Sequence, residues 1–398
     1  MDQNYPQVTV RKLRRPKYEQ DLVGEVTRFD EADQPMARGD MKPDSERWRK
    51  YYDKHPSWEN QGRAWAKLPH RWDGEFQDVI LVPTISETIH FLAKEESVDG
   101  PVAEKKVELS PELAARKIKS LLRHFGADLV GIGPLNQYWV YSHVGRDKFG
   151  DKHLGIPISL PHKHAIVPVI HLNLDMIKFA PNLPIHLETM RTYSQLAFMT
   201  AFVARYIRAL GYPARAHNLW NYQVILPPVA VDAGLGELAR NGVIISPQFG
   251  NAIKLGAITT DLPLVNDPPI DVGVDEFCKE CSLCAEYCPV GAIPSGDKTV
   301  VRGFRKWKLN DAACYGYHRV IGTDCGICLA VCPWSRTRRF PHNVIAAAVQ
   351  RSGPIRKIAI TTDSWIGRRV TGRQPDWLGA LPPVKRKRNR RSSSGQRQ

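Results

Sequence analysis

The 398-residue sequence has no long apolar run. Its longest apolar stretch, Leu196–Ala204, is interrupted by Thr200 and is far shorter than the roughly 18 residues that a membrane-spanning helix needs. This pattern excludes a transmembrane helix. A hydrophobic content of 42% with 9% aromatic residues is typical of a folded globular protein, and the length predicts two to three domains.

Cysteine is missing from most of the chain. All eight cysteines lie between Cys278 and Cys332. A disulfide framework would spread its cysteines through the chain or belong to a much smaller protein. The confinement of the cysteines to one short window therefore predicts a metal centre.

Acidic residues are missing from the end of the chain. The sequence has 56 Lys+Arg against 41 Asp+Glu, a formal net charge of +15. Seven basic residues and no acidic residue fall within 384–398, so this short segment supplies about half of the positive excess. Its composition predicts a disordered basic tail over 385–398.

An apolar segment is also missing after the basic pair Arg14-Arg15, because Pro16, Lys17 and Tyr18 follow it. Secretory and twin-arginine signals both need such a segment. We therefore expect a cytoplasmic protein, with peripheral association with a membrane as the alternative location.

Apolar periodicity predicts alternating helices and strands in the middle of the chain. Ser110 as the N-cap and Pro111 at the first helical position begin a helix that ends at Gly126. The other predicted elements are strands at 128–132, 164–170 and 222–226, a long buried helix at 186–210, and a proline-rich linker at 261–271. The alternation predicts an α/β (α+β) sandwich around a sheet.

The cysteines form two runs that each end in Cys-Pro. The first is Cys278-x2-Cys281-x2-Cys284-x3-Cys288-Pro289, and the second is Cys314 followed by Cys325-x2-Cys328-x3-Cys332-Pro333. In bacterial two-cluster ferredoxins the fourth cysteine of each run ligates the other cluster. By this rule one [4Fe–4S] cluster is held by Cys278, Cys281, Cys284 and Cys332, and the other by Cys288, Cys314, Cys325 and Cys328.

Zinc held by four thiolates and inert thiols are the alternatives to iron–sulfur clusters, but the Cys-Pro endings and the count of four plus four favour two clusters. Motifs for other redox partners are absent: there is no G-x-G-x-x-G after a strand, no P-loop and no H-E-x-x-H. The string Asp151-Lys152-His153-Leu154-Gly155 is one residue short of the D-x-H-x-x-G motif that places a histidine on cobalt.

The run DAGLGELARNGVIISPQFGNAIKLGAITTDLPL (232–264), followed by the two cysteine runs, resembles the reductive dehalogenase family. The strings GADLVGIGPLNQYWVYS, YIRALGYPA and TDCGICLAVCPWS resemble it too, and the similarity extends over about 110–340. One departure is the sequence PQFGNA, where relatives usually carry P-E-F-G-P-R.

This resemblance implies a nitroreductase-like corrinoid domain followed by a bacterial two-[4Fe–4S] ferredoxin-like domain. The cobalamin would be bound base-off, with no protein ligand on cobalt. The expected divisions are an N-terminal arm and wrapping region (1–109), a cobalamin-binding catalytic domain (110–270), a ferredoxin-like domain (271–340), a C-terminal extension (341–384) and the basic tail (385–398).

Glycines that allow close backbone approach predict that the 232–264 segment binds the corrinoid. The candidate cofactor-binding residues are Gly234, Gly236, Gly242, Pro247, Phe249 and Gly250. A glycine-rich connection between strands is the alternative interpretation of this segment.

The resemblance makes Tyr141 the candidate proton donor. A phenol with a pKa near 10 keeps its proton at neutral pH and can yield it to a carbanion beside a cation. A buried aromatic ring with a merely satisfied hydroxyl is the alternative. Asn173 is a candidate partner of the phenol or the substrate, or else a turn residue. Arg205 is preferred as the cation, because Arg208 lies in a more widespread I-R-x-L-G-Y string.

The implied function is the reduction of an organohalide with two electrons and one proton. Electrons would come from a ferredoxin, a flavodoxin or a membrane-associated reductant. The alternatives are an epoxyqueuosine reductase, which shares the cofactors and acts on tRNA, and a non-catalytic electron-transfer or corrinoid protein. The basic balance and the basic tail favour the tRNA-acting enzyme, because runs of Lys and Arg bind phosphates. A tyrosine in place of a carboxylate donor, and the lack of a helical-repeat segment after the cysteines, argue against nucleic acid as the partner.

Overall fold

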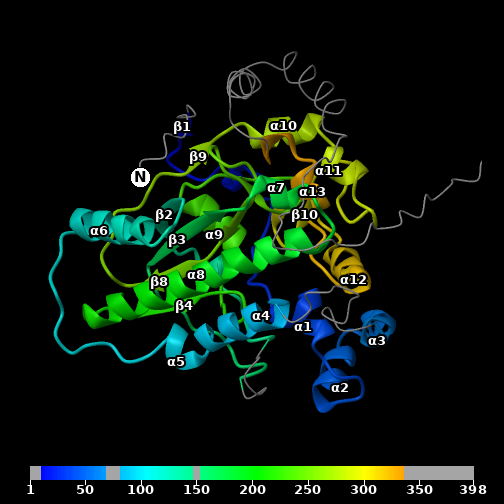
Figure 1. Cartoon of the computed structure of the whole chain (residues 1–398), viewed down its shortest axis with the longest axis horizontal. Coiled ribbons are helices and arrows are strands. Elements are labelled where there is room, and N and C mark those ends of the chain that lie inside the picture. The colour runs from blue at the N-terminus through cyan, green and yellow to red at the C-terminus, as the bar shows by residue number, and fades with distance from the viewer. Residues whose placement is uncertain (1–9, 69–80, 147–152, 336–398) are drawn as a thin grey trace, which may run out of the picture.

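The structure is a computed structural model, which describes residues 10–68, 81–146 and 153–335 (Figure 1). The predicted C-terminal extension (341–384), the predicted tail (385–398) and the last five residues of the predicted ferredoxin-like range lie outside the described residues. The same holds for Asp151 and Lys152 of the incomplete cobalamin motif.

The described residues form mostly short helices and strands around one long helix. In chain order, the helices are α1 (Pro35–Gly39), α2 (Glu46–Tyr52), α3 (Glu59–Ala66), α4 (Leu81–Leu92), α5 (Glu95–Val98), α6 (Pro111–His124), α7 (Leu174–Ile177), α8 (Leu183–Ala209), α9 (Leu226–Asp232), α10 (Val274–Glu280), α11 (Leu283–Glu286), α12 (Asp311–Ile321) and α13 (Ile327–Ala330). The strands are β1 (Arg11–Lys12), β2 (Leu129–Pro134), β3 (His164–His171), β4 (Ala214–His217), β5 (Glu237–Leu238), β6 (Ile244–Ile245), β7 (Ile253–Leu255), β8 (Ala257–Thr260), β9 (Ile270–Asp271), β10 (Thr299–Val301) and β11 (Phe304–Lys306).

A five-stranded sheet lies at the centre of the described chain. Its strand order is β2-β3-β8-β4, and β7 pairs with another part of β3. Every pairing is antiparallel: Ile166 of β3 lies opposite Ile132 of β2 and Ile258 of β8. The predicted combination of helices and a sheet is confirmed, and the antiparallel pairing gives it the α+β form.

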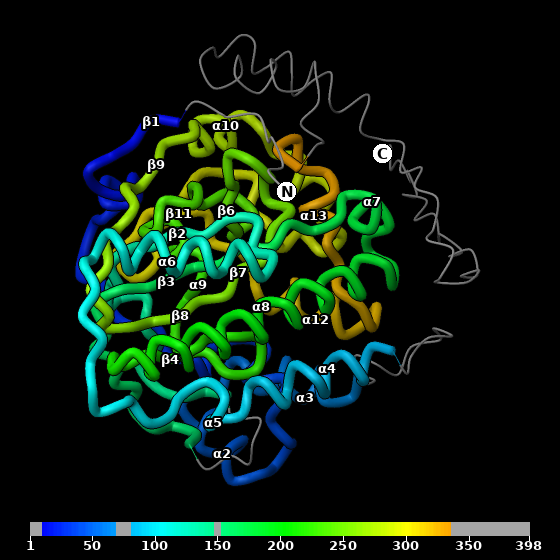
Figure 2. The backbone as a smooth tube through the Cα atoms, turned by 60° about the vertical axis from the view of Figure 1, so that its left-hand side comes forward, coloured from blue at the N-terminus to red at the C-terminus, as the bar shows by residue number. Residues whose placement is uncertain are grey.

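Helices cover both faces of this sheet. Side chains of a strand alternate between its two faces, so an apolar strand such as β3 contributes to a core on each side. On β3, Ile166 and Ile170 pack into a core formed with α6 and α8. The intervening Val167 and Val169 pack into a second core formed with α9. Figure 2 shows α6 and α8 running alongside β3 and β8.

Several predicted elements form close to their expected positions. Ser110 caps α6, where its Oγ accepts a hydrogen bond from the backbone N of Leu113 at 3.2 Å, and α8 begins three residues before the predicted start of the long helix. The predicted strand at 222–226 is wrong. Only an isolated bridge between Val140 and Val224 forms there, and α9 follows at once because two prolines suit its first turn.

The N-terminal part of the chain lies against the sheet domain. β1 pairs with β9, so that Arg11 lies opposite Asp271. The guanidinium of Arg28 donates to the carbonyl oxygens of Val140 and Tyr141. This part of the chain therefore holds the backbone beside Tyr141, the predicted proton donor.

The cysteines lie on short helices beside the sheet domain. The first run spans α10 and α11, Cys314 lies on α12, and the last run spans α13. α11 contacts α13, so the two runs lie side by side although about 40 residues separate them. Within the described residues, no helix is long and apolar enough to cross a membrane.

Candidate functional site

The structure gathers the cysteines into two sets. Burial raises the pKa of Cys332 well above its usual value, and the proximity of Cys278, Cys281 and Cys284 raises it further. Burial likewise raises the pKa of Cys314, and the proximity of Cys325 and Cys288 raises it further. The sets are Cys278, Cys281, Cys284 and Cys332, and Cys288, Cys314, Cys325 and Cys328. The crossed count predicts the same groups, although Cys328 also lies near Cys284 of the first set. The assignment of the cysteines as cluster ligands stays a prediction.

The environment of these thiols suits a cationic iron–sulfur cluster. Burial, and then the neighbouring cysteines, raise the pKa of Cys328 to about 12 and that of Cys314 to about 11. Four such thiols become thiolates only beside compensating positive charge, which iron ions supply. Among the described residues, no group of three or more His, Cys, Asp or Glu side chains is placed to hold a single metal ion.

A buried arginine ties the first cysteine set to the sheet domain. The guanidinium of Arg240 donates to the carbonyl oxygen of Cys278 at 2.6 and 3.0 Å, and to those of Pro294 and Gly296 at 2.9 and 2.8 Å. It also lies over the ring of Trp307, 4.7 Å from the ring centroid. Arg240 thus fixes the loops around this set and places a positive charge beside the thiols.

The six candidate cofactor-binding residues of the glycine-rich segment do not line the cavity that contains Tyr141. A side chain at Gly234 would meet the carbonyl oxygen of Pro268 at 2.5 Å, and one at Gly250 would meet that of Trp334 at 2.0 Å. Phe249 stacks on His171. These glycines are needed for close packing against the linker and the cysteine module, so the alternative of a tight connection describes them better.

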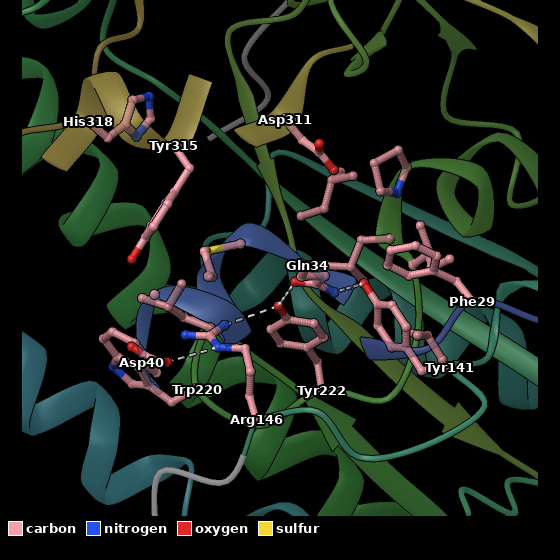
Figure 3. Close-up of a pocket in the computed structure, with 18 of the residues that line it drawn as sticks. Phe29, Gln34, Asp40, Tyr141, Arg146, Trp220, Tyr222, Asp311, Tyr315 and His318 are labelled. Carbon is pink, nitrogen blue, oxygen red and sulfur yellow. Dashed lines mark hydrogen bonds and ion pairs between the residues drawn. The ribbon is translucent and has the colours of Figure 1, made fainter. Parts of the chain in front are cut away.

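That cavity, of about 1030 Å³, lies between the N-terminal region, α8, the stretch around 218–227 and α12. This volume is at the upper end of the range for small-molecule sites. Figure 3 shows Tyr141, Tyr222 and Gln34 gathered together in this cavity, with Tyr315 and His318 of α12 on the other side of the view.

Tyr141 is fully enclosed at this cavity. Its hydroxyl oxygen accepts a hydrogen bond from Nε2 of Gln34, which lies just before α1. Burial raises the pKa of Tyr141 well above 10, and the nearby Tyr222 and Glu31 raise it further, while Arg146 and Arg302 act in the opposite direction. The phenol therefore keeps its proton at neutral pH, as the sequence prediction requires.

Three further polar residues surround the phenol. Oη of Tyr222 donates to Oε1 of Gln34 at 3.0 Å and accepts from Nη1 of Arg146 at 3.1 Å. Glu31 accepts the backbone N–H groups of Gly145 and Arg146 at 2.9 and 3.1 Å. Burial raises the pKa of Glu31 to about 7, although these hydrogen bonds and the charge of Arg146 oppose the shift.

The cations near Tyr141 are Arg146 and Arg302, and the preference for Arg205 is corrected. Arg205 is exposed on α8 and does not line the cavity. The alternative Arg208 is buried, but it donates to the carbonyl oxygens of Val98 and Ala214 and has the structural role that its sequence context suggested.

Asn173 does not line the cavity either. It is the N-cap of α7, where its side-chain oxygen accepts the backbone N–H of Asp175 at 2.9 Å. Its own backbone N–H donates to Glu188. The structure thus assigns Asn173 the turn-forming role that was the alternative, and its candidate role beside the phenol is corrected.

The cavity wall reaches the second cysteine set. His186, His318 and Asp324 all line the cavity. Nδ1 of His186 lies 2.9 Å from Oδ2 of Asp324, and Nδ1 of His318 lies 3.7 Å from Oδ1 of the same carboxylate. Nε2 of His318 lies 3.9 Å from Sγ of Cys314. A single side chain therefore separates the cavity from this cysteine.

Comparison with known proteins finds relatives of the cysteine-containing region and of a larger part of the chain. Residues 277–343 match the family of 4Fe–4S dicluster domains. The tetrachloroethene reductive dehalogenase of Sulfurospirillum multivorans is 32% identical over 281 residues, which cover 63% of this chain and 56% of that protein. The chain is related to the reductive dehalogenases.

The solved structures of reductive dehalogenases support this relationship over most of the chain. The catabolic reductive dehalogenase NpRdhA, in complex with 3-bromo-4-hydroxybenzoic acid, matches with a TM-score of 0.73 and 26% identity, over 91% of this chain and 50% of that one. The epoxyqueuosine reductase of Lactococcus garvieae is a more limited match, 29% identical over 123 residues, or 27% of this chain and 31% of that protein. The chain spans about half the length of the reductive dehalogenases that it matches.

These relatives confirm the resemblance that the sequence motifs indicated. Sequence reasoning nevertheless missed Gln34, Arg146 and Tyr222. Gln34 lies 107 positions before Tyr141 in a segment without clear periodicity, and Tyr222 was placed in a strand. No spacing rule connects residues so far apart, and only the fold brings them together.

Proposed function

We propose that this chain is a reductive dehalogenase, which converts an organohalide R–X, two electrons and a proton into R–H and a halide ion. The observation that carries the proposal is a buried phenol, Tyr141, on a cavity whose wall touches Cys314 through His318. A proton donor and an electron supply thus meet at one enclosed site. The relationship to reductive dehalogenases supports the same reaction.

We propose cobalamin as the resident cofactor of the cavity. A reductive dehalogenase that matches this chain with a TM-score of 0.72 and 27% identity is described as suggesting a mechanism for B12-dependent dehalogenation. The cavity also offers Asn218, whose buried Oδ1 has no hydrogen-bond partner; such an acceptor fits the amide N–H groups of a corrinoid side arm. When bound, the cofactor supplies the electron-rich metal that reduces the carbon–halogen bond.

The two cysteine sets would hold [4Fe–4S] clusters that deliver electrons one at a time. We propose that Cys278, Cys281, Cys284 and Cys332 hold one cluster, and that Cys288, Cys314, Cys325 and Cys328 hold the other. The grouping of the thiols and their match to a dicluster domain support this assignment. The set that contains Cys314 borders the cavity wall and would be the inner one.

The protein residues position the substrate and control the proton. Tyr141 gives its phenolic proton to the carbon that loses the halide. The resulting phenolate accepts the Gln34 N–H group, and the positive charges of Arg146 and Arg302 stabilise it. Burial in the cavity excludes bulk water, which strengthens these interactions.

The direct test is halide release. Protein prepared without oxygen, with both clusters and cobalamin, is given a strong artificial reductant and a panel of chlorinated and brominated aromatics and alkenes. Ion chromatography should detect chloride or bromide that depends on the protein and on the reductant. Halide release that is equal with cobalamin alone would contradict the proposal.

Reduction of epoxyqueuosine in tRNA is the second candidate function, supported by the shorter match to an epoxyqueuosine reductase and by the net charge of +15. Incubation of the same protein with modified tRNA, followed by nucleoside analysis, tests it. The electron donor (a ferredoxin, a flavodoxin or a membrane-associated reductant) and the cytoplasmic location stay predictions, which pull-down and cell-fractionation experiments can test.

A further inference from the structure

Tyr141 lies at the end of a chain of hydrogen bonds that begins at a buried arginine (Figure 3). Nη1 of Arg146 donates to Oη of Tyr222 at 3.1 Å. Oη of Tyr222 donates to Oε1 of Gln34 at 3.0 Å, and Nε2 of Gln34 donates to Oη of Tyr141. All four residues line the same cavity.

The arginine sets the direction of every hydrogen bond in this chain. A guanidinium has donors only, so Oη of Tyr222 must accept from Arg146. The single proton of Tyr222 is then left for Gln34, which must turn its amide oxygen toward it. The amide nitrogen of Gln34 therefore faces Tyr141. The chemistry of the neighbouring groups alone thus fixes the orientation of this amide.

Consequently, none of these four residues accepts the hydroxyl proton of Tyr141. Within the described residues, Oη of Tyr141 has no other hydrogen-bond partner than Gln34. We propose that Arg146, Tyr222 and Gln34 form a one-directional hydrogen-bond chain that aims the hydroxyl proton of Tyr141 into the cavity, with Gln34 as the positioning residue.

The N-terminal region holds this chain in place. Glu31 accepts the backbone N–H group of Arg146, and Oδ2 of Asp40 lies 3.5 Å from Nε of the same residue. Gln34 lies between these two acids in the sequence, at the N-cap of α1. A segment far from Tyr141 in the sequence thus sets the direction of the Tyr141 hydroxyl.

The catalytic consequence rests on the proposed reductive dehalogenation. The O–H bond of Tyr141 breaks, a C–H bond forms on the substrate carbon, the carbon–halogen bond breaks, and the two electrons come from the clusters. The phenolate then accepts the N–H group that already faces it, so no side chain has to turn during the step. An amide does not pass a proton on, so Tyr141 regains its proton from the cavity side.

The substitution Gln34→Glu tests the direction. A carboxylate has the same size but only acceptors, so the side chain at this position would accept the hydroxyl proton of Tyr141 and reverse its role. The tyrosine Fermi doublet in ultraviolet Raman spectra distinguishes a phenol that accepts a hydrogen bond from one that donates. Subtracting the spectrum of the matching Tyr141→Phe protein isolates this one residue in the intact holoenzyme.

We expect an acceptor signature for Tyr141 in the wild type and a donor signature in Gln34→Glu. Halide release should fall at least about tenfold, because the donated proton is turned away from the substrate. The matched control is Gln61→Glu, on an exposed face of α3, where the side chain accepts from Arg38. The control should leave both the doublet and the rate unchanged.

An unchanged doublet in folded Gln34→Glu overturns the proposal. Tyr222→Phe decides the same question without a new charge: it frees the Gln34 amide to turn over, so the pure acceptor signature of Tyr141 should be lost, and its persistence overturns the proposal as well. If the wild type releases no halide from any substrate, the proposed function fails, but the doublets still decide the direction of the chain.

Discussion

Burial determines what Tyr141 can do as a single residue. It raises the pKa of the phenol well above 10, while Arg146 and Arg302 oppose that shift. In the proposed reaction, the proton would be retained until a basic carbanion develops beside it, and two cations would stabilise the phenolate left behind. This balance between burial and positive charge is the property expected of a general acid that must not ionise in advance.

Replacement of Tyr141 by phenylalanine isolates that role. The ring still fills its place in the core, so folding, iron content and corrinoid content should survive. The rate of halide release should fall by about 10² to 10⁴, the usual contribution of general-acid assistance. Ion chromatography after anaerobic turnover gives the rate, and Tyr206→Phe, on α8 and outside the cavity lining, is the matched control. A rate equal to that of the wild type would make Tyr141 a packing residue.

Glu31 predicts a pH dependence of stability. Burial raises its pKa from 4.5 to about 7 in the folded chain. A carboxyl group with a raised pKa favours folding while protonated, so this contribution is complete below pH 4.5 and is lost as the pH rises through about 7. Glu31→Gln keeps a carbonyl acceptor for Gly145 and Arg146 but cannot ionise. It should gain stability relative to the wild type between about pH 5 and pH 8, by up to about 3 kcal/mol.

Urea denaturation midpoints across this pH range provide the measurement. The exposed Glu104 offers a control, because Glu104→Gln should change the midpoints equally at every pH. Parallel curves for Glu31→Gln and the wild type would show that Glu31 does not ionise in a buried environment.

At the scale of elements, each of the two cysteine runs contributes residues to both cysteine sets. Cys332, which follows α13, lies with Cys278 and Cys281, whereas Cys328 on the same helix lies with Cys314. Burial and mutual proximity raise the pKa values of the Cys278, Cys314, Cys328 and Cys332 thiols, so these thiols should bind iron with the release of protons.

Single substitutions test the crossing. Cys332→Ser should weaken the same cluster as Cys278→Ser, and Cys328→Ser should weaken the other one. Iron should fall from about eight to about four atoms per chain in each case, since each proposed cluster holds four irons. Electron paramagnetic resonance of the reduced proteins identifies which cluster remains. Identical residual spectra for Cys332→Ser and Cys328→Ser would contradict the crossed assignment.

The elements also show what the sequence could predict. Local signals identified α6, because Ser110 and Pro111 mark its start, and α8, because its apolar residues run without a break. The strand predicted at 222–226 failed because a short apolar run does not distinguish a strand from an extended approach to a helix. The antiparallel order of the sheet depends on long-range pairing, which no local pattern encodes.

The site was predictable only where residues are close in sequence or match a known motif. The cysteines and Tyr141 satisfied one of these conditions, whereas Gln34, Arg146 and Tyr222 satisfied neither. Arg205 was preferred over Arg208 on the same helix, but one turn of a helix decides which side chain is exposed, and neither of them faces the cavity. Gly234, Gly236 and Gly250 pack closely against neighbouring backbone. A glycine-rich sequence does not separate this role from cofactor binding.

At the scale of the whole molecule, the cavity, the buried phenol and the two cysteine sets form one proposed pathway for electrons and a proton. The most direct measurement is a turnover experiment in D₂O with a counted supply of reductant. For every two electrons consumed, we expect one halide ion and one deuterium in the product, at the carbon that lost the halogen. Electrons consumed without halide, or halide released with no deuterium at that carbon, would contradict this pathway.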